Sequence, residues 1–307
     1  MSRRAGLLLV LALMGAGWGV TQPLAKIAVS EGYRHFGLVF WQLAIGAVVL
    51  TAVQAVRRRP FRRDPTALFF YVLIATIGTV LPNAASYEAA RHLPAGIVSI
   101  LISTVPLMAF PLAIAMGNER FRLARLAGVA CGFAGILLIA GPETALPDPA
   151  MAAFLPIALI APAFYAVEGN VVAKWGTGGL SPIELLHGAS VVGVALALPL
   201  TLATDSFIDP RPPWGLPDLA LILSSTIHVI VYSTYVWLIA RAGATFAAQV
   251  AYLVTGFGVL WAMLLLGERF SPFVWLGMAA IMGGVFLVQP RDETSLAETP
   301  DRVKSEA

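Results

Sequence analysis

Apolar residues run through the chain in stretches of about 20, and short polar segments separate these stretches. A helix that crosses the hydrocarbon core of a bilayer needs about 20 consecutive, mostly apolar residues. Strands of a membrane β-barrel would be about 10 residues long and would alternate in polarity, which these stretches do not. The pattern therefore predicts an all-α polytopic membrane protein. Ten transmembrane helices are expected, over residues 5–27, 36–56, 67–90, 94–116, 122–141, 152–173, 183–204, 216–239, 244–266 and 272–289.

Three of these segments begin with residues that favour helix starts. The sequence SPIE, from Ser181 to Glu184, is a capping box with proline at the first helical position. Ser271 and Asp64, each followed by proline, open two further segments in the same way. These residues predict where the helices begin and carry no information about function.

The composition strengthens the membrane prediction. Hydrophobic residues make up 58% of the chain and charged residues only 12%, whereas about 25% of a soluble domain is charged. The single cysteine, Cys131, excludes an intramolecular disulfide and a cysteine-based metal site. No cofactor or metal is expected. The net charge of +3 sits in short loops, so no nucleic-acid partner is expected either.

The basic residues predict how the chain is oriented in the membrane. If the N-terminus is cytoplasmic and ten helices cross, 15 of the 20 Lys and Arg residues fall on the cytoplasmic side. This bias fits the positive-inside rule, with both the N- and C-termini cytoplasmic. The polar tail over residues 291–307 is expected to be disordered.

The chain contains an internal duplication, with one five-helix unit over residues 1–145 and a second over 146–290. Residues 119–138 align with 268–287 at 7 of 20 positions, and the glycines stay in register. Because five is an odd number, the second unit must enter the membrane from the opposite side. The duplication therefore predicts two inverted five-helix repeats. In secondary transporters the substrate site lies near the midplane where such repeats meet.

Specific stretches resemble a known family. They are GWGVTQPLAK in the first segment, LISTVPLMAFPLAIAMGNERF (101–121), VTGFGVLWAMLLLGERF (254–270), and the glycine-rich fifth and tenth segments. Over about residues 5–289 the sequence is similar to bacterial EamA-type members of the drug/metabolite transporter superfamily. Asn118 interrupts the G-E-R ending in the first copy, and the second copy lacks a proline equivalent to Pro106.

The resemblance implies ten helices around a central cavity lined by helices 1, 3, 4, 6, 8 and 9. It also implies a place in the bacterial cytoplasmic (inner) membrane, and mostly the export of amino acids and related metabolites.

Polar side chains at membrane depth are the candidates for substrate binding, because they are costly in lipid and usually face a cavity or a partner helix. Some recur at helical spacing within one segment. Alternatively, they form hydrogen bonds between helices or, for serine and threonine, to their own helix backbone. The candidate substrate-binding residues are Trp18, Thr21, Gln22, Asn83, Tyr87, Ser103, Tyr165, Glu168, His228, Tyr232, Tyr235, Gln249 and Tyr252.

Glu168 is the sharpest of these candidates, because it is the only carboxylate well inside a predicted span. At this depth a carboxyl group can carry a proton or bind an amine. The alternative is an ion pair with Lys174 or a bond to a neighbouring helix. His228 lies near the middle of its segment, where it either titrates near neutral pH or stays neutral and hydrogen-bonded.

Other residues favour packing and anchoring roles. Gly128, Gly132 and Gly135 form a face of small residues on the fifth segment, and the tenth segment is also rich in glycine. These two helices either pack together within the chain or form a homodimer face. Glu119 and Glu268 recur at the same place in both copies, which suggests a structural anchor such as a helix-end cap.

The first segment combines small residues with a proline. Gly15 and Gly19 predict a close helix contact. Pro23 removes one backbone hydrogen bond and is expected to kink the outer half of the helix. Lys26 is expected to reach the outer surface, and Glu88 and Arg91 are expected to form an ion pair at the outer end of the third segment.

The leading functional hypothesis is a secondary transporter that exports small organic metabolites such as amino acids, by alternating access through a central cavity. A proton-coupled efflux pump for multiple drugs or cations is the second hypothesis. An integral-membrane enzyme is the third, and neither H-E-x-x-H nor G-x-S-x-G occurs in the sequence. The expected partners are a small-molecule substrate and the lipid bilayer, with a homodimer as one further arrangement.

Overall fold

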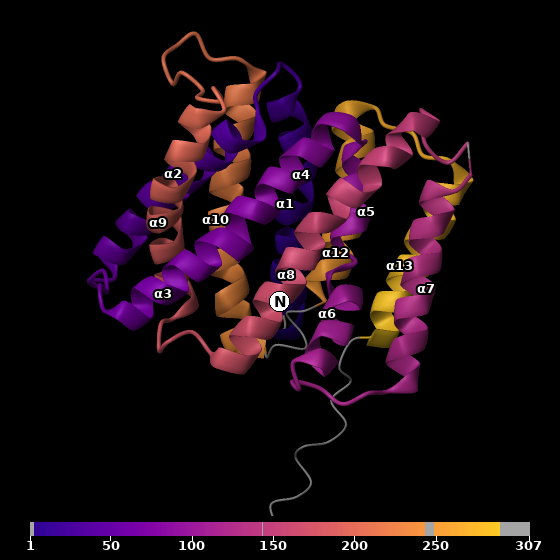
Figure 1. Cartoon of the computed structure of the whole chain (residues 1–307), viewed down its shortest axis with the longest axis horizontal. Coiled ribbons are helices and arrows are strands. Elements are labelled where there is room, and N and C mark those ends of the chain that lie inside the picture. The colour runs from indigo at the N-terminus through magenta and orange to yellow at the C-terminus, as the bar shows by residue number, and fades with distance from the viewer. Residues whose placement is uncertain (1–2, 143, 243–248, 289–307) are drawn as a thin grey trace, which may run out of the picture.

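The structure is a computed structural model that describes residues 3–142, 144–242 and 249–288. Within these residues the chain is helical and contains no strand, and the helices form one bundle (Figure 1). In chain order the helices are α1 (Arg3–Val29), α2 (His35–Val56), α3 (Pro65–Ile74), the π-helix η1 (Ala75–Val80), α4 (Leu81–His92), α5 (Ala95–Ile102), α6 (Val105–Ala115), α7 (Leu123–Ala140), the 3₁₀-helix η2 (Pro149–Phe154), α8 (Leu155–Trp175), α9 (Pro182–Ala203), α10 (Leu216–Ala242), α12 (Val250–Leu266) and α13 (Pro272–Val288).

Helices occupy all ten predicted segments within the described residues, which confirms an all-α polytopic architecture. Eight described stretches are long and apolar enough to cross a membrane, and α12 and α13 are two shorter apolar helices. The start of the ninth predicted segment, residues 244–248, lies outside the described residues. The predicted tail 291–307 also lies outside them.

The helix starts follow the capping residues in the sequence. At the start of α9, Ser181 Oγ accepts the Glu184 backbone N–H, and the Glu184 side chain accepts the Ser181 N–H at 2.8 Å, as predicted. Asp64 caps α3 by accepting a backbone N–H of its first turn at 3.1 Å. Ser271 precedes α13, but it donates its hydroxyl to the Ala145 carbonyl at 2.9 Å. This bond ties the start of α13 to the loop before α8.

Two predicted helices are interrupted where their backbone bonding changes. The third predicted segment contains η1 between α3 and α4. Pro82 follows η1 and has no N–H for the carbonyl of Gly78 one turn earlier, which is a physical reason for the wider turn. The fourth predicted segment divides into α5 and α6 at Ser103 and Thr104, whose hydroxyls donate to carbonyls three residues earlier.

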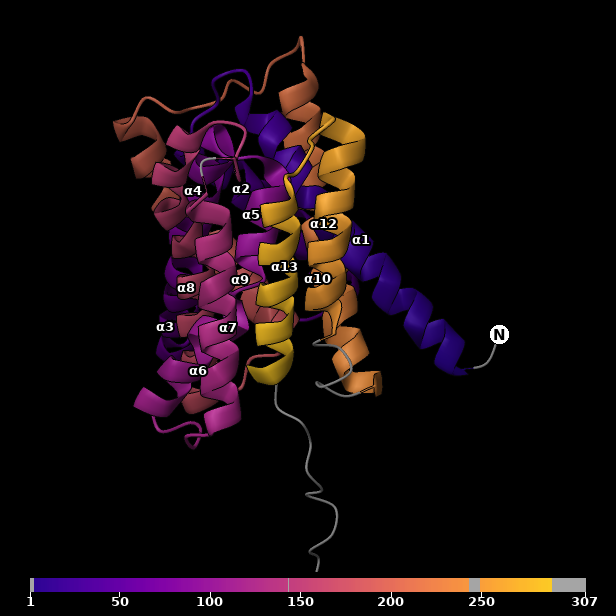
Figure 2. The ribbon, with the colours of Figure 1, turned by 90° about the vertical axis from the view of Figure 1, so that its right-hand side faces the viewer.

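Helices α7 and α13 pair along their length and lie side by side at one edge of the bundle (Figures 1 and 2). A Cβ placed on Gly128 would lie 2.7 Å from the Gly284 carbonyl oxygen, and one on Gly135 would lie 2.6 Å from that of Gly277. Glycine therefore allows the two backbones to touch. Of the two arrangements expected for these faces, the structure has the pairing within the chain through Gly128, Gly135, Gly277 and Gly284.

Helix α1 remains one helix through Pro23 and packs against α10 and α12. Gly15 and Gly19 make the contact with α12 close, since a Cβ on Gly19 would lie 2.8 Å from the Gly258 nitrogen. This confirms the close contact predicted for the first helix. Figure 2 shows the N-terminal part of α1 leaning away from the bundle, where side chains such as Leu13 are exposed.

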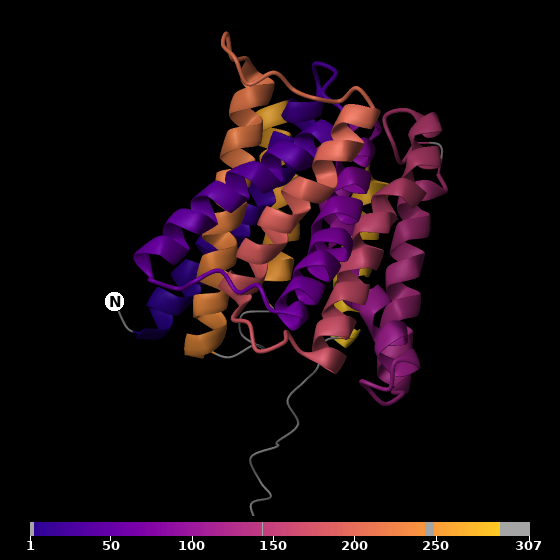
Figure 3. The same cartoon turned by 60° about the vertical axis from the view of Figure 1, so that its left-hand side comes forward.

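Helix neighbours repeat between the two halves of the chain. Helix α1 packs against α10 and α12, and its counterpart α8 packs against α4 and α6. Helix α2 packs against α10, and its counterpart α9 packs against α3, on the side that Figure 3 brings forward. Each contact that a helix of the first half makes with the second half thus has an equivalent contact in the opposite direction. This is the arrangement expected of repeats related by a two-fold axis.

Candidate functional site

A hydrogen-bonded network joins α2, α4 and α8. Gln42 Oε1 accepts hydrogen bonds from Asn83 Nδ2 at 3.2 Å and from the Tyr87 hydroxyl at 3.0 Å. Asn83 Oδ1 in turn accepts the Tyr165 hydroxyl at 2.8 Å. Three of these four side chains were predicted site residues, and the network fixes how each of them is oriented.

Gln42 was not among the predicted site residues, although it carries the same signal as Asn83. It is an amide inside an apolar stretch, and a large polar group in lipid needs a specific partner. The resemblance implies a cavity lined by six helices, and the second helix is not one of them.

Four rings of α1 and α10 form an aromatic group. The ring centroid of Trp18 lies 5.5 Å from that of Tyr235 and 6.2 Å from that of His228. The rings of His228 and Tyr232 lie 6.4 Å apart at an interplanar angle of 22°. Trp18 Nε1 is buried and has no hydrogen-bond partner in the described part of the chain, so one buried donor remains open to a ligand or a water molecule.

Glu168 on α8 follows Tyr165 of the network by one turn of the same helix. It also lies within electrostatic range of Tyr232 of the aromatic group. A Cβ placed on Gly78 of η1 would lie 2.6 Å from Glu168 Oε1. No residue that the structure describes forms a hydrogen bond or ion pair with this half-buried carboxylate.

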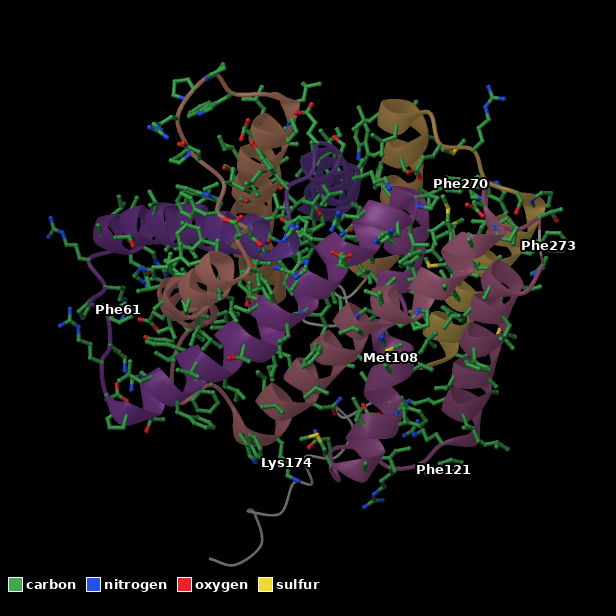
Figure 4. All side chains as sticks on the ribbon, turned by 45° about the horizontal axis from the view of Figure 1, so that its top comes forward. Phe61, Met108, Phe121, Lys174, Phe270 and Phe273 are labelled. Carbon is green, nitrogen blue, oxygen red and sulfur yellow. The ribbon has the colours of Figure 1, made fainter. Side chains whose placement is uncertain are left out.

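The expected alternative of a Glu168–Lys174 ion pair is wrong. Lys174 Nζ instead donates to the Met116 carbonyl at the end of α6, at 2.8 Å. Figure 4 shows Lys174 at the rim of the bundle, toward the end where Phe121 lies and away from Phe270. Residues six positions apart on one helix point to different faces, which keeps the lysine from the carboxylate.

Together these residues form the central polar cluster. Its members are Trp18, Gln42, Asn83, Tyr87, Tyr165, Glu168, His228, Tyr232 and Tyr235.

The hydroxyl groups of two predicted site residues form hydrogen bonds to the backbone near their own position in the helix instead. The Thr21 hydroxyl donates to the Trp18 carbonyl at 2.7 Å, and the Ser103 hydroxyl donates to the Ile100 carbonyl at 2.6 Å. Both follow the alternative set out for serine and threonine, because a short hydroxyl side chain reaches the carbonyl one turn back.

Three further predicted site residues make no polar contact with the cluster. Tyr252 packs against a hydrophobic cluster that includes Ile97 and Leu101 of α5. Gln249 is exposed at the start of α12. Gln22 is half-buried on α1, and its amide forms no hydrogen bond within the described ranges.

Charged residues anchor helix ends at the side of the bundle away from Lys174. Glu268 accepts the first two backbone N–H groups of α5 at 2.6 and 3.0 Å, which confirms the helix-end cap suggested for this glutamate. Lys26 donates to the Leu93 carbonyl at 3.0 Å. In the first copy, Glu119 pairs with Arg125, so the two copies use the same glutamate differently.

Glu88 is the centre of a second charged group at that side. The expected pair with Arg91 is present at 3.4 Å, and His35 and His92 lie 3.1 and 3.2 Å from the same carboxylate. These contacts connect the start of α2 with the end of α4. The described residues contain no group of His, Cys, Asp and Glu side chains that could hold a metal ion.

The sequence also matches a known family. The pattern of the EamA-like transporter family matches residues 4–141 and again residues 154–289. An Escherichia coli K12 protein named "Uncharacterized inner membrane transporter YedA" is 25% identical over 279 residues, which cover 88% of this chain and 86% of that protein.

Two further proteins are similar over nearly the whole chain. A Streptantibioticus cattleyicolor protein named "Probable terminal-alkyne amino-acid exporter" is 25% identical, covering 93% of this chain and 94% of that one. A solved crystal structure superposes with a TM-score of 0.61 at 19% identity, covering 93% of this chain and 96% of the other, and so supports the fold. Since the family pattern matches both halves, the chain belongs to the EamA-like transporter family, within the drug/metabolite transporter superfamily.

Proposed function

We propose that the chain is a secondary transporter that exports small organic metabolites such as amino acids. The observation that carries this proposal is the central polar cluster, to which both halves of the chain contribute. Gln42 and Asn83 come from the first half, and Tyr165, Glu168 and Tyr232 come from the second. Substrate sites of repeat-built transporters lie where the repeats meet. A relative named as an amino-acid exporter supports the same class of substrate.

Alternating access would arise from rocking of the two inverted units, residues 1–145 and 146–290, around this cluster. The helix contacts that exchange between the halves support such units. The anchors support it too, because Glu268 and Lys26 hold helix ends together at one side. Their counterparts lie at the other side. Glu119 forms an ion pair within the first half, and Lys174 donates a hydrogen bond to the end of α6. The two sides are thus held differently, as one state of a rocking transporter requires.

We place both termini in the cytoplasm, with the protein in the bacterial cytoplasmic membrane. The arginine-rich link over residues 57–63 would then face the cytoplasm, in agreement with the positive-inside rule. The link over residues 141–150 has no basic residue and would face outward. The relative YedA is named as an inner membrane transporter, which supports the same membrane.

Efflux from proteoliposomes tests the transport function. Purified protein would be reconstituted and the vesicles loaded with a panel of radiolabelled amino acids. At least one amino acid should leave several-fold faster than from protein-free vesicles. Asn83→Leu, which removes both amide bonds of the network, should abolish this efflux, whereas Glu31→Gln in the exposed loop after α1 should preserve it. Release no faster than from empty vesicles for every solute tested would reject the proposal.

A proton-coupled efflux pump for multiple drugs is the second candidate. It is favoured by the Glu168 carboxylate, which has no ion-pair partner in the described part of the chain and lies one turn after Tyr165 on α8. A pH gradient across the vesicles should then drive transport of a lipophilic cation. Glu168→Gln should abolish the gradient-driven component, and unchanged transport by this variant would remove the candidate. The relatives are named transporters, which supports a role other than that of an enzyme.

A further inference from the structure

Glu168 is a carboxylate inside the bundle that has no hydrogen-bond or ion-pair partner among the residues that the structure describes. It lies about four turns from the start of the α8 segment, well within the membrane-spanning stretch. An ionised carboxylate at this depth is costly unless an opposite charge or a proton compensates it. Glu168 is also only half-buried, so part of its side chain remains accessible.

Lys174 on the same helix, Lys26 on α1 and Arg241 on α10 are engaged elsewhere. Lys174 and Lys26 each donate to a backbone carbonyl, at 2.8 and 3.0 Å. The guanidinium of Arg241 lies over the Trp237 ring, 5.9 Å from its centroid, at the end of α10. Within the described residues the protein therefore supplies no cation to Glu168.

The surroundings of Glu168 provide both space and aromatic faces. Gly78 leaves the carboxylate room, since a Cβ there would lie 2.6 Å from Oε1 and 3.0 Å from Oε2. Tyr165 precedes Glu168 by one turn of α8. Tyr232 of α10 lies within electrostatic range of the carboxylate and stacks on His228. Aromatic faces attract cations through their quadrupole, most strongly in a desolvated site.

We propose that Glu168 binds a protonated amine of the transported solute, with Tyr165 and Tyr232 on either side of the ammonium group. The inference rests on the proposed transport function and narrows its substrates to small organic solutes that carry a free amino group. A neutral solute of the same shape leaves the carboxylate uncompensated, so it binds more weakly.

A matched pair of probes tests this inference on the purified full-length protein. 2-Phenylethylamine and 2-phenylethanol differ only in the amine, and quenching of tryptophan fluorescence measures the binding of each. The wild-type protein should bind the amine about tenfold more tightly than the alcohol. Glu168→Gln should remove this preference, and Glu168→Asp should keep part of it. The preference should persist in Glu31→Gln, which removes an exposed carboxylate instead.

Gly78→Ala provides a test that keeps the carboxylate. The added methyl group meets the mobile end of the Glu168 side chain and not a backbone atom, so the fold tolerates it and the carboxylate must move. The affinity for 2-phenylethylamine should fall several-fold, while that for 2-phenylethanol stays the same. An alcohol bound as tightly as the amine by the wild type, or an amine bound equally well by Glu168→Gln, would overturn the inference.

The transport assay separates this inference from the proposed function. L-Phenylalanine should leave loaded vesicles, and N-acetyl-L-phenylalanine, which has no basic amine, should not. If both leave at the same rate, transport stands and amine recognition by Glu168 is wrong. If neither leaves although the amine still binds through Glu168, amine recognition stands and the export function is wrong.

Discussion

The side-chain oxygen of Gln42 serves two donors at once, Asn83 Nδ2 and the Tyr87 hydroxyl. Gln42→Leu leaves both donors without an acceptor inside the bundle. A side-chain hydrogen bond between membrane helices is worth about 1 kcal/mol, so the variant should unfold at a lower temperature. It should also bind substrate more weakly, because Asn83 loses the contact that orients it.

Gln42→Glu is the matched control, since it keeps an acceptor oxygen at nearly the same volume. Thermal unfolding in detergent and the KM for efflux would be measured for both variants. Equal losses in the two variants would show that the acceptor oxygen is not what matters at this position.

At the residue scale, the sequence identified the polar side chains that are costly to place in lipid. It did not show which of them form hydrogen bonds with one another. Glu168 and the aromatic residues of α10 stood out because each is large and polar within an apolar run. Thr21 and Ser103 showed the same polarity, but a hydroxyl can bond to its own helix, and the sequence cannot distinguish the two outcomes.

Among the elements, the pairing of α7 with α13 depends on the absence of side chains. Gly135→Ala would place a methyl group 2.6 Å from the Gly277 carbonyl oxygen, which must push the helices apart. The free energy of unfolding should fall by about 1–3 kcal/mol, as for other overpacked sites. Thermal unfolding measures this effect.

Gly283→Ala on α13 makes the same change where nothing lies within 4 Å of the new methyl group. Stability should stay the same or rise slightly, because alanine favours a helix more than glycine does. A loss as large as that of Gly135→Ala would mean that the helix contact is not the cause.

Helix α5 begins on the carboxylate of Glu268, which accepts two of its backbone N–H groups. Glu268→Ala should lower the free energy of unfolding by about 1 kcal/mol, the usual cost of losing a cap. Hydrogen exchange at the amides of Ala95 and Gly96 should become faster. The equivalent change in the first copy, Glu119→Ala, removes an ion pair with Arg125 and should leave those two amides protected.

The positions of the elements could be predicted because lipid demands long apolar helices, and hydropathy records that demand directly. The interruptions could not, because hydropathy does not record backbone bonding. The segment that contains η1 and the one divided at Ser103 are both predominantly apolar. Pro82 and Pro106 were visible in the sequence, but proline is tolerated in membrane helices without any fixed local geometry.

For the whole molecule, the proposed topology can be checked with single cysteines. Cys131 is the only cysteine, so Cys131→Ala provides a clean background. In that background, Asp209→Cys should react with a membrane-impermeant maleimide in intact cells, and Arg58→Cys should react only after lysis. Labelling of both positions from the same side would contradict the proposed orientation and the inverted repeat.

The duplication was visible in the sequence because helix-end motifs and glycines recur at a nearly constant spacing. The equivalent helix contacts in the two halves were not visible in the sequence, because they depend on which helix faces pack against each other. Asn83 and Tyr165, for example, are 82 positions apart in the chain, and their side chains form a hydrogen bond between two helices.

Gly78 and Glu168 occupy one shared volume, because the side chain missing from the first makes room for the second. If Glu168 binds an amine, the two positions should therefore vary together among relatives. A relative whose solute carries no amine should lack the acid, and a larger residue should be accepted at position 78. Reading these two positions in the sequence of a relative would then predict the charge of what it carries, without any structure of that relative.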